Sequence, residues 1–418
     1  NTYSVQLLDN KLYVYYGDLH RHPICGDASC TDSSHEVGVD WTGVDTLSDS
    51  MTAGYYYLTT DVTLNTQWTP KDGIVLCLNG HSIRAANHGK AIVVANGGAL
   101  TLTDCIGAGK LIHTSGYAGT GVCILTGGTF TMYSGIITGN NSLDNSGGVY
   151  NFGTFKLYGG SITGNSAQDS GGGVYNRGTF EMRGGAITGN AADEDHRRIE
   201  GGGGVYNCGV FEMTGGTIKE NSSWYYGGGV YSGSNATTRI YGGSITRNEA
   251  RQGGGVFAEP DNGVHLKGNV IIKNNGPAGT NDLLANTTHY LDGSLDSSSK
   301  IGLSVPSSTA DGMKLLQPEA NCTIASDDLD RFFFNNKSAG YEMNLNSDGT
   351  VTLAMPHKHT LCNGTSHTGA GHSDSCSGSI RFAEWTDAEA QKMYGGASAK
   401  AANCLPTSGD WYLTQDVT

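Results

Sequence analysis

Histidine and cysteine residues gather near the start of the chain at a spacing that could bind a metal ion. A His-x-His-x-x-Cys motif is followed by one more cysteine and one more histidine, which gives five candidate ligands: His20, His22, Cys25, Cys30 and His35. Zinc takes four nitrogen or sulfur ligands in a tetrahedron, which this segment could supply. In a secreted protein the same cysteines would instead form a Cys25–Cys30 disulfide beside solvated histidines, and we expect this second arrangement.

The same motif occurs a second time near the other end of the chain. It comprises His357, His359 and Cys362, an offset of 337 residues from the first copy (20 to 357), and Cys376 follows. Because the later spacing differs between the copies, a Cys362–Cys376 disulfide is expected here too. We therefore expect no cofactor, with a zinc or calcium ion as the alternative.

Charged residues of both signs are concentrated in an insertion at 191–200. Two carboxylates beside a histidine, such as Asp193 and Asp195 beside His196, could serve acid–base cleavage of a glycosidic bond. Mixed charges on a loop are more commonly a solvated tip. The neighbouring strands carry only single outward carboxylates, Glu181 and Glu212. We therefore expect no catalytic residues and no hydrolase or lyase activity.

Three consecutive aromatic residues form a further candidate site at an expected turn. Trp224, Tyr225 and Tyr226 would stack on sugar rings if their own rings were exposed, because aromatic faces pack well against apolar ring faces. The alternative is that they cover one corner of the fold. They are the candidate glycan contact of this chain.

A repeated unit in the middle of the chain must position the charged insertion and the three aromatic residues. The phrase Gly-Val-Tyr-Asn and its variants recur with valines at 149, 174, 205, 230 and 256, in steps of 25, 31, 25 and 26 residues. Each unit holds three short runs of alternating apolar residues, bounded by Gly, Asn or Ser, and no helical pattern. A fixed period of this size indicates a solenoid. Three strands per coil predict an all-β fold, a parallel β-helix.

Equivalent residues of successive units are expected to stack along the axis. One inward column would contain Phe130, Phe155, Phe180 and Phe211, and a second would contain Ile136, Ile162, Ile187, Ile218 and Ile245. Asparagines recur at one corner, and stacked side-chain amides bond to one another. We expect a structural ladder of Asn140, Asn165, Asn190, Asn221, Asn248 and Asn274.

Two further cysteines are spaced by about one coil. Cys77 and Cys105 lie 28 residues apart (77 to 105), which would place them in adjacent coils. We expect a Cys77–Cys105 disulfide, because an extracellular compartment favours disulfides.

Composition excludes several classes of function. The net charge is −14, which argues against nucleic-acid and anionic-membrane partners. No run of 18 apolar residues occurs, so we expect no transmembrane helix. The 64 glycines follow the repeat, which indicates turns rather than disorder.

Several phrases resemble those of a known group of proteins. They are Tyr-Tyr-Leu-Thr-x-Asp-Val-Thr-Leu (56–64), Leu-Cys-Leu-Asn-Gly-His-Ser-Ile (76–83), Leu-Thr-Asp-Cys (102–105) and Gly-Gly-x-Ile-Thr-Gly-Asn. They resemble the large extracellular right-handed β-helix proteins of Gram-positive gut and rumen anaerobes. The resemblance implies the right-handed pectate-lyase-like fold, secretion and display at the cell surface.

The two motif copies suggest that the chain is part of a tandem array. We expect the tail hairpin of a preceding module (1–19), a His/Cys segment (20–57), a β-helix (58–275), a β-rich cap (276–355) and the start of the next module (356–418). The expected function is a structural or adhesive module of an extracellular or cell-surface fibre. Its partners would be neighbouring modules joined head to tail, and host or plant glycans. The alternative is a carbohydrate-active enzyme (a polysaccharide lyase or glycoside hydrolase) or a glycan-binding module on the same fold.

Overall fold

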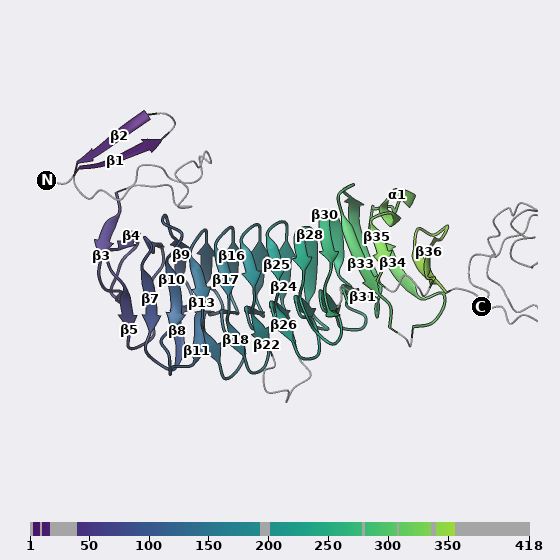
Figure 1. The fold of residues 1–418 in the computed structure, drawn as a ribbon, viewed down its shortest axis with the longest axis horizontal. Helices are drawn as coiled ribbons and strands as arrows, with labels where there is room; N and C mark the ends of the chain where they lie inside the picture. The colour runs from purple at the N-terminus through teal and green to yellow at the C-terminus, as the bar shows by residue number, and fades with distance from the viewer. Residues whose placement is uncertain are drawn as a thin grey trace, which may run out of the picture. The chain divides into compact units, whose positions relative to one another are not determined.

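Short parallel strands stacked coil upon coil make up the described structure (Figure 1). The computed structural model describes residues 40–192, 201–277, 281–306, 309–335 and 340–355, and the backbone of an antiparallel hairpin of β1 (Tyr3–Leu8) and β2 (Lys11–Tyr16). The chain divides into two compact units, Asn1–His357 and Lys358–Thr418, and the second lies outside the described residues. The described part of the first is a right-handed parallel β-helix of about nine turns, which confirms the predicted all-β fold.

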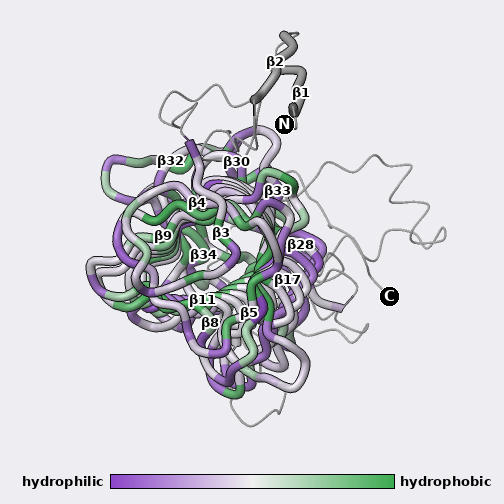
Figure 2. Tube along the Cα trace, turned by 90° about the vertical axis from the view of Figure 1, so that its left-hand side faces the viewer, coloured by the Kyte–Doolittle hydropathy of each residue, from purple (hydrophilic) through white to green (hydrophobic). Residues whose placement is uncertain are grey.

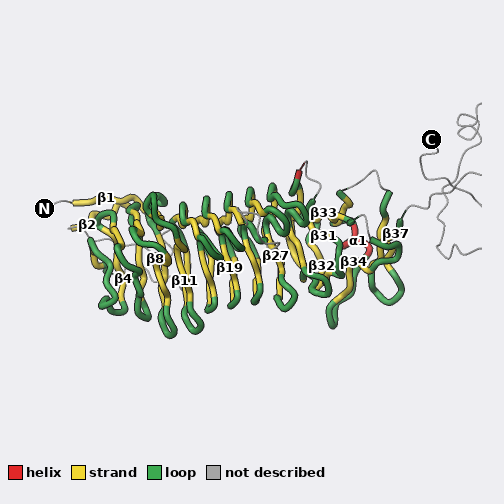
Figure 3. The backbone as a smooth tube through the Cα atoms, turned by 90° about the horizontal axis from the view of Figure 1, so that it is seen from below, coloured by secondary structure: helices red, strands yellow, loops and turns green. Residues whose placement is uncertain are grey.

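Each regular coil contributes one strand to each of three parallel strips, and Figure 3 shows the strands of successive coils side by side. The valine strip, named for its inward residue, starts with the long strands β8 and β11. Its members are β8 (Gly89–Val94), β11 (Gly119–Ile124), β15 (Val149–Asn151), β19 (Val174–Asn176), β23 (Val205–Asn207), β27 (Val230–Ser232), β29 (Val256–Ala258), β31 (Leu283–Leu284), β33 (Lys300–Ser304) and β35 (Phe332–Phe334).

The phenylalanine strip follows the valine strip in each regular coil. It begins with β3 (Thr42–Val44), which pairs with β4, and ends with β34. Its other members are β4 (Gly54–Leu58), β6 (Ile74–Cys77), β9 (Ala99–Thr103), β12 (Thr129–Met132), β16 (Thr154–Leu157), β20 (Thr179–Met182), β24 (Val210–Met213), the first halves of β28 (Thr237–Thr246) and β30 (His265–Lys273), β32 (His289–Leu295) and β34 (Lys314–Pro318).

The isoleucine strip completes each coil, and a small four-stranded sheet follows it at one corner. The strip contains β5 (Val62–Leu64), β7 (Ser82–Ala85), β10 (Lys110–His113), β13 (Ile136–Thr138), β17 (Ser161–Thr163), β21 (Ala186–Thr188), β25 (Thr217–Lys219) and the second halves of β28 and β30. The corner sheet consists of β14 (Asn141–Ser142), β18 (Ser166–Ala167), β22 (Ala191–Ala192) and β26 (Ser222–Ser223).

Equivalent inward side chains of successive coils stack in register inside the cylinder, and Figure 2 looks along the superposed coils. Phe130, Phe155, Phe180 and Phe211 are fully buried, with ring centroids of successive coils 4.7–5.4 Å apart and nearly parallel planes. The predicted phenylalanine column is therefore confirmed. The isoleucine column is confirmed from Ile162 onward, but its first member is Ile137 rather than Ile136, because Ile137 pairs with Ile162.

The predicted asparagine ladder exists at the corner after the isoleucine strip. Each Nδ2 donates to the Oδ1 of the asparagine in the next coil at 2.9–3.0 Å. The same Oδ1 accepts a second hydrogen bond, from the backbone N–H of the donating asparagine. The members are Asn140, Asn165, Asn190, Asn221, Asn248 and Asn275.

The last member corrects the prediction, which named Asn274. Asn274 occupies the turn position just before the ladder residue and has a positive φ of 59°. The same position is held by Gly189, Glu220 and Arg247 in earlier coils, also with positive φ. Asparagine tolerates this left-handed conformation better than most residues, so two adjacent asparagines are compatible with the corner and only the second is in the ladder.

A second amide ladder along the valine strip was not predicted. Asn151 donates to Asn176 at 2.7 Å, Asn176 to Asn207 at 2.8 Å, and Asn207 to the hydroxyl of Thr238 at 2.9 Å. All three asparagines are fully buried. The repeated Val-Tyr-Asn phrase contains the signal for this ladder, because Asn follows Val by two positions and therefore shares its inward face.

The parallel pairing continues beyond Asn275, although the sequence period ends there. The segment expected as a cap therefore begins with the parallel strands β31 to β35 and a short helix, α1 (Ser326–Leu329). An antiparallel hairpin of β36 (Glu342–Leu345) and β37 (Val351–Ala354) follows, and β37 pairs antiparallel with β34. The hairpin thus occupies part of the strand edge that the last coil would otherwise expose.

Candidate functional site

The outer face of the phenylalanine strip changes from coil to coil, unlike its inner face. A second buried column on the same strands, the methionine column, contains Met132, Leu157, Met182, Met213, Ile240, Leu266 and Leu291. The residues just before its members point outward and include Thr131, Lys156, Glu181, Glu212, Arg239, His265 and Tyr290. Residues just after that column include Tyr158, Arg183, Tyr241, Lys267, Asp292 and Glu319. This face is therefore the place where the fold presents varied chemistry.

A histidine and two carboxylates meet at the C-terminal part of this face. His265 lies in β30, Asp292 in β32, and Glu319 directly follows β34. The Nδ1 atom of His265 is 2.8 Å from Oδ1 of Asp292 and 3.8 Å from Oε1 of Glu319. The three ligand atoms lie within 4.8 Å of one another. Among the described residues, these side chains form the one group of histidine, cysteine or carboxylate residues close enough together to hold a metal ion.

Aromatic residues hold this cluster in place. The hydroxyl of Tyr241 donates to Oδ2 of Asp292, and the ring of Tyr290 stacks on the imidazole of His265 with centroids 4.6 Å apart. The ammonium of Lys267 lies 3.9 Å from the centroid of the Tyr241 ring. Burial, and then the hydrogen bond to Asp292, raise the pKa of Tyr241, so it stays a neutral hydrogen-bond donor.

The sequence prediction missed this cluster. Asp292 and Glu319 are spaced by one coil of 27 residues (292 to 319), but both follow the end of the recognisable repeat. This spacing is a signal that could have found Asp292 and Glu319. The contribution of His265 could not be read in this way, because it lies one outward position earlier in its own coil.

Two buried ionisable groups terminate the asparagine ladder. At one end, the Nδ1 atom of His113 lies 2.8 Å from Oδ1 of Asn140, at hydrogen-bond distance. At the other end, Asp282 accepts hydrogen bonds from the backbone N–H and from Nδ2 of Asn275, both at 2.8 Å. Burial lowers the pKa of His113 and raises that of Asp282, while the bonds from Asn275 oppose the latter shift. Their place inside the cylinder makes them ends of a structural network.

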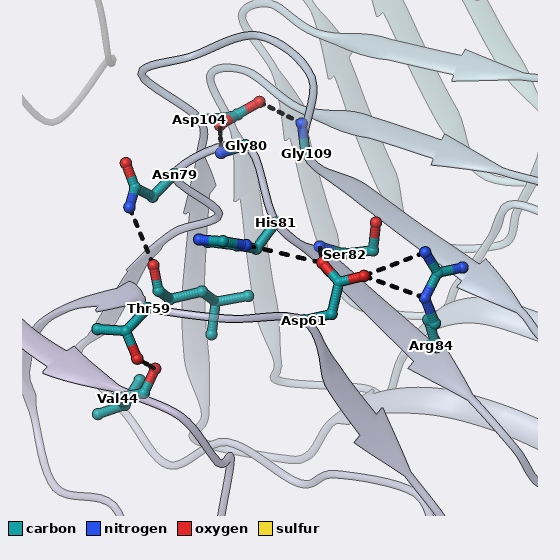
Figure 4. Close-up of polar contacts among 11 residues, drawn as sticks. Val44, Thr59, Asp61, Asn79, Gly80, His81, Ser82, Arg84, Asp104 and Gly109 are labelled. Atoms are coloured by element: carbon teal, nitrogen blue, oxygen red, sulfur yellow. Dashed lines mark hydrogen bonds and ion pairs between the residues drawn. The ribbon is translucent and has the colours of Figure 1, made fainter.

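A polar cluster joins the first coils, as Figure 4 shows. Asp104 accepts the backbone N–H groups of Gly80 and Gly109 at 2.7 and 2.6 Å. Asp61 accepts the backbone N–H of Ser82 and pairs with the guanidinium of Arg84 at 3.1 Å. The bond from Ser82, followed by that from Arg84, lowers the pKa of Asp61. These contacts connect the coil turns to their neighbours.

Cys77 and Cys105 come together in adjacent coils, as their spacing predicted, but they do not form the predicted disulfide. Their Sγ atoms are 3.5 Å apart, whereas a disulfide bond is about 2.05 Å long. Cys77 is fully buried against Trp41 and Val75. Burial raises the pKa of its thiol, which favours the protonated form.

The aromatic candidates are placed unequally. Trp224 is 52% exposed. Tyr226 packs against Phe257 with centroids 4.1 Å apart, and Tyr225 packs edge-on against Tyr226. The guanidinium of Arg251 lies 5.4 Å from the centroid of the Tyr225 ring. Tyr226 thus packs against the side of an outward aromatic stack of Tyr175, Tyr206, Tyr231 and Phe257.

Several predicted residues lie outside the described residues. They are the two histidine and cysteine segments, with His20, His22, Cys25, Cys30, His35, His357, His359, Cys362 and Cys376, and the charged insertion with Asp193, Asp195 and His196. The disulfide and metal alternatives for these segments stay predictions.

Comparisons of the chain with protein-family models, curated proteins and solved structures give no match. Secretion and surface display therefore stay predictions from the resemblance of short phrases. Within the described ranges, no helix has the length and apolar character needed to cross a membrane.

Proposed function

We propose that this chain is a structural module of an extracellular or cell-surface fibre built from tandem β-helical repeats. The observation that carries the proposal is the unbroken asparagine ladder, which runs from His113 through six amides to Asp282. A stack of four buried phenylalanines runs along the same β-helix.

These ladders favour mechanical continuity over a catalytic cleft. Each amide in the middle of the ladder also donates to a backbone carbonyl, for example Asn190 to Ile162 at 2.9 Å, so the donors are satisfied inside the cylinder. A chain of hydrogen bonds pointing in one direction strengthens each of its members. A coil that slipped or tilted would break bonds on both sides, which supports a stiff rod.

A glycan-directed role is the second candidate, and two observations favour it. Trp224 is about half exposed, and the outer face carries the acidic cluster of Asp292 and Glu319 beside His265. A ring for stacking and carboxylates for polar contacts are common features of sugar-binding surfaces. On this proposal the glycan would bind to the wall of the rod.

Immunoelectron microscopy of the producing cells, with antibodies raised against the purified chain, tests the structural role. Label along surface fibres is the expected result, and label confined to the cell interior would contradict it. A hydrolysis and lyase screen on plant and host polysaccharides tests the alternative. Turnover by the wild type that is lost in Asp292→Asn or in an Asp193→Asn/Asp195→Asn variant would replace the structural proposal by an enzymatic one.

A further inference from the structure

We propose that His265, Asp292 and Glu319 bind a divalent transition-metal ion on the outer face of the phenylalanine strip. The site would be separate from the histidine and cysteine segments near the two ends of the sequence. It goes beyond the structural role, since neither ladder involves these residues. The ion would take one nitrogen and two carboxylate oxygens, with water in its remaining positions.

The fold holds the two carboxylates together. Leu291 pairs with Pro318 in parallel register, so the residues that follow them, Asp292 and Glu319, occupy the same column in adjacent coils. Adjacent strands are about 4.8 Å apart, and like charges that face each other at this spacing are destabilising. A divalent cation between the two carboxylates would remove this repulsion.

The histidine is on the correct side to complete the site. Its Nδ1 lies 2.8 Å from Asp292 and 3.8 Å from Glu319, whose side chains are 15% and 41% exposed. The contact with Asp292 is a good hydrogen bond, whereas the contact with Glu319 is too long for one. A metal ion would draw the second carboxylate in. His265 would then bind the ion through Nδ1 as a neutral imidazole, with its remaining proton on Nε2.

The surrounding side chains orient the ligands before any ion arrives. Tyr241 bonds to Oδ2 of Asp292, which leaves Oδ1 directed at His265. Tyr290 stacks on His265 with an angle of 11° between the ring planes, which restricts rotation of the imidazole. Outer groups of this kind commonly fix the direction of ligands in metal sites.

The ligand set indicates which ion to use as the probe. One imidazole with two carboxylates and water suits Mn²⁺, whereas cysteine thiolates select softer ions. Mn²⁺ therefore separates this site from the cysteine-containing segments at 20–35 and 357–376. Titration of Mn²⁺ into the purified full chain, followed by electron paramagnetic resonance of the free ion, measures its affinity and stoichiometry.

The variants are His265→Gln and Glu319→Gln, with His81→Gln as the matched control. His81 also faces a carboxylate, with Nδ1 3.7 Å from Oδ1 of Asp61, but it belongs to no three-ligand group among the described residues. We expect one Mn²⁺ per wild-type chain, an affinity loss of at least about tenfold in each test variant, and no change in the control.

Thermal unfolding with and without Mn²⁺ provides a second measurement, because an ion that binds only the folded chain raises its melting temperature. The rise should disappear in Glu319→Gln, which keeps the shape of the side chain. The proposal is overturned if the wild type binds no Mn²⁺ at millimolar concentration. It is equally overturned if both test variants bind as the wild type does.

Discussion

The two faces of the phenylalanine strip follow opposite rules. Inside, Phe155, Phe180 and Phe211 occupy one position in three successive coils. Outside, the very next residues are Lys156, Glu181 and Glu212, and the column then continues through Arg239 to His265. The strands are the same, and only the direction of the side chain differs.

The reason for this difference is the geometry of stacking. An inward residue must fill the space between two copies of itself about 4.8 Å away, so a change in one coil leaves a cavity or a clash in three. An outward residue meets water on one side and tolerates change. The inner face therefore sets stability, and the outer face is available for binding.

The largest expected effect comes from replacing, in separate variants, two neighbouring residues on one strand by alanine. Phe180→Ala should lower the free energy of unfolding by about 3–5 kcal/mol, because it opens a cavity in the stacked core. Glu181→Ala removes an outward side chain and its surface ion pair with Arg183, which should cost no more than about 1 kcal/mol. Denaturant unfolding measures both. Equal losses would show that inside and outside do not differ as we describe.

A buried histidine extends the comparison to pH. His289 is fully buried, its Nδ1 accepts the backbone N–H of Val264, and its Nε2 contacts the carbonyl of Leu284. Burial lowers its pKa from 6.5 to about 4. The folded chain therefore binds this proton less readily than the unfolded chain. Stability from this residue is complete above pH 6.5 and is lost as the pH falls from 6.5 towards 4, on the order of 3 kcal/mol.

Unfolding of the wild type and of His289→Gln, each followed between pH 7.5 and pH 4, isolates this effect. The glutamine keeps one donor and one acceptor but does not titrate, so its stability should fall less steeply with acid. His88→Gln, at an exposed position, serves as the control. Parallel pH profiles for the wild type and His289→Gln would refute the assignment.

Cutting the asparagine ladder should have a smaller effect. Asn190→Ala removes the acceptor of two N–H groups of Asn165 and the donor to Asn221. We expect a loss of about 2 kcal/mol, since each buried group without a partner costs about 1–3 kcal/mol and a water molecule can replace part of the amide. Asn141→Ala, an exposed asparagine next to the ladder, should be close to neutral. A neutral Asn190→Ala would mean that the ladder does not stabilise the rod.

The smallest expected effect concerns thiol reactivity. Cys77 is fully buried and its pKa is raised by burial, whereas Cys322 is partly exposed. Because the thiolate is the reacting form, alkylation of the native protein should label Cys322 well before Cys77. Mass spectrometry after brief treatment with iodoacetamide measures the order. Equal labelling would show that the first coils open readily.

The repeat alone determined the architecture, the three strands per coil and the phenylalanine column. These follow from the sequence because a fixed period aligns each residue with its copy in the next coil, and alternation then decides which residues face inward. Five of the six ladder asparagines followed in the same way. The sixth required the backbone, because Asn274 and Asn275 are adjacent and only the φ of Asn274 distinguishes the turn residue from the ladder residue.

The tertiary structure decided what lies beyond the repeat. The cluster of His265, Asp292 and Glu319 draws on three coils and on two outward columns, and its residues occur singly in the sequence. The spacing of Cys77 and Cys105 predicted that they are neighbours. Only the structure shows that their Sγ atoms are 3.5 Å apart and form no disulfide bond. Periodicity specifies which residues are neighbours. The distances and directions that make neighbours react or bind depend on how each coil is packed.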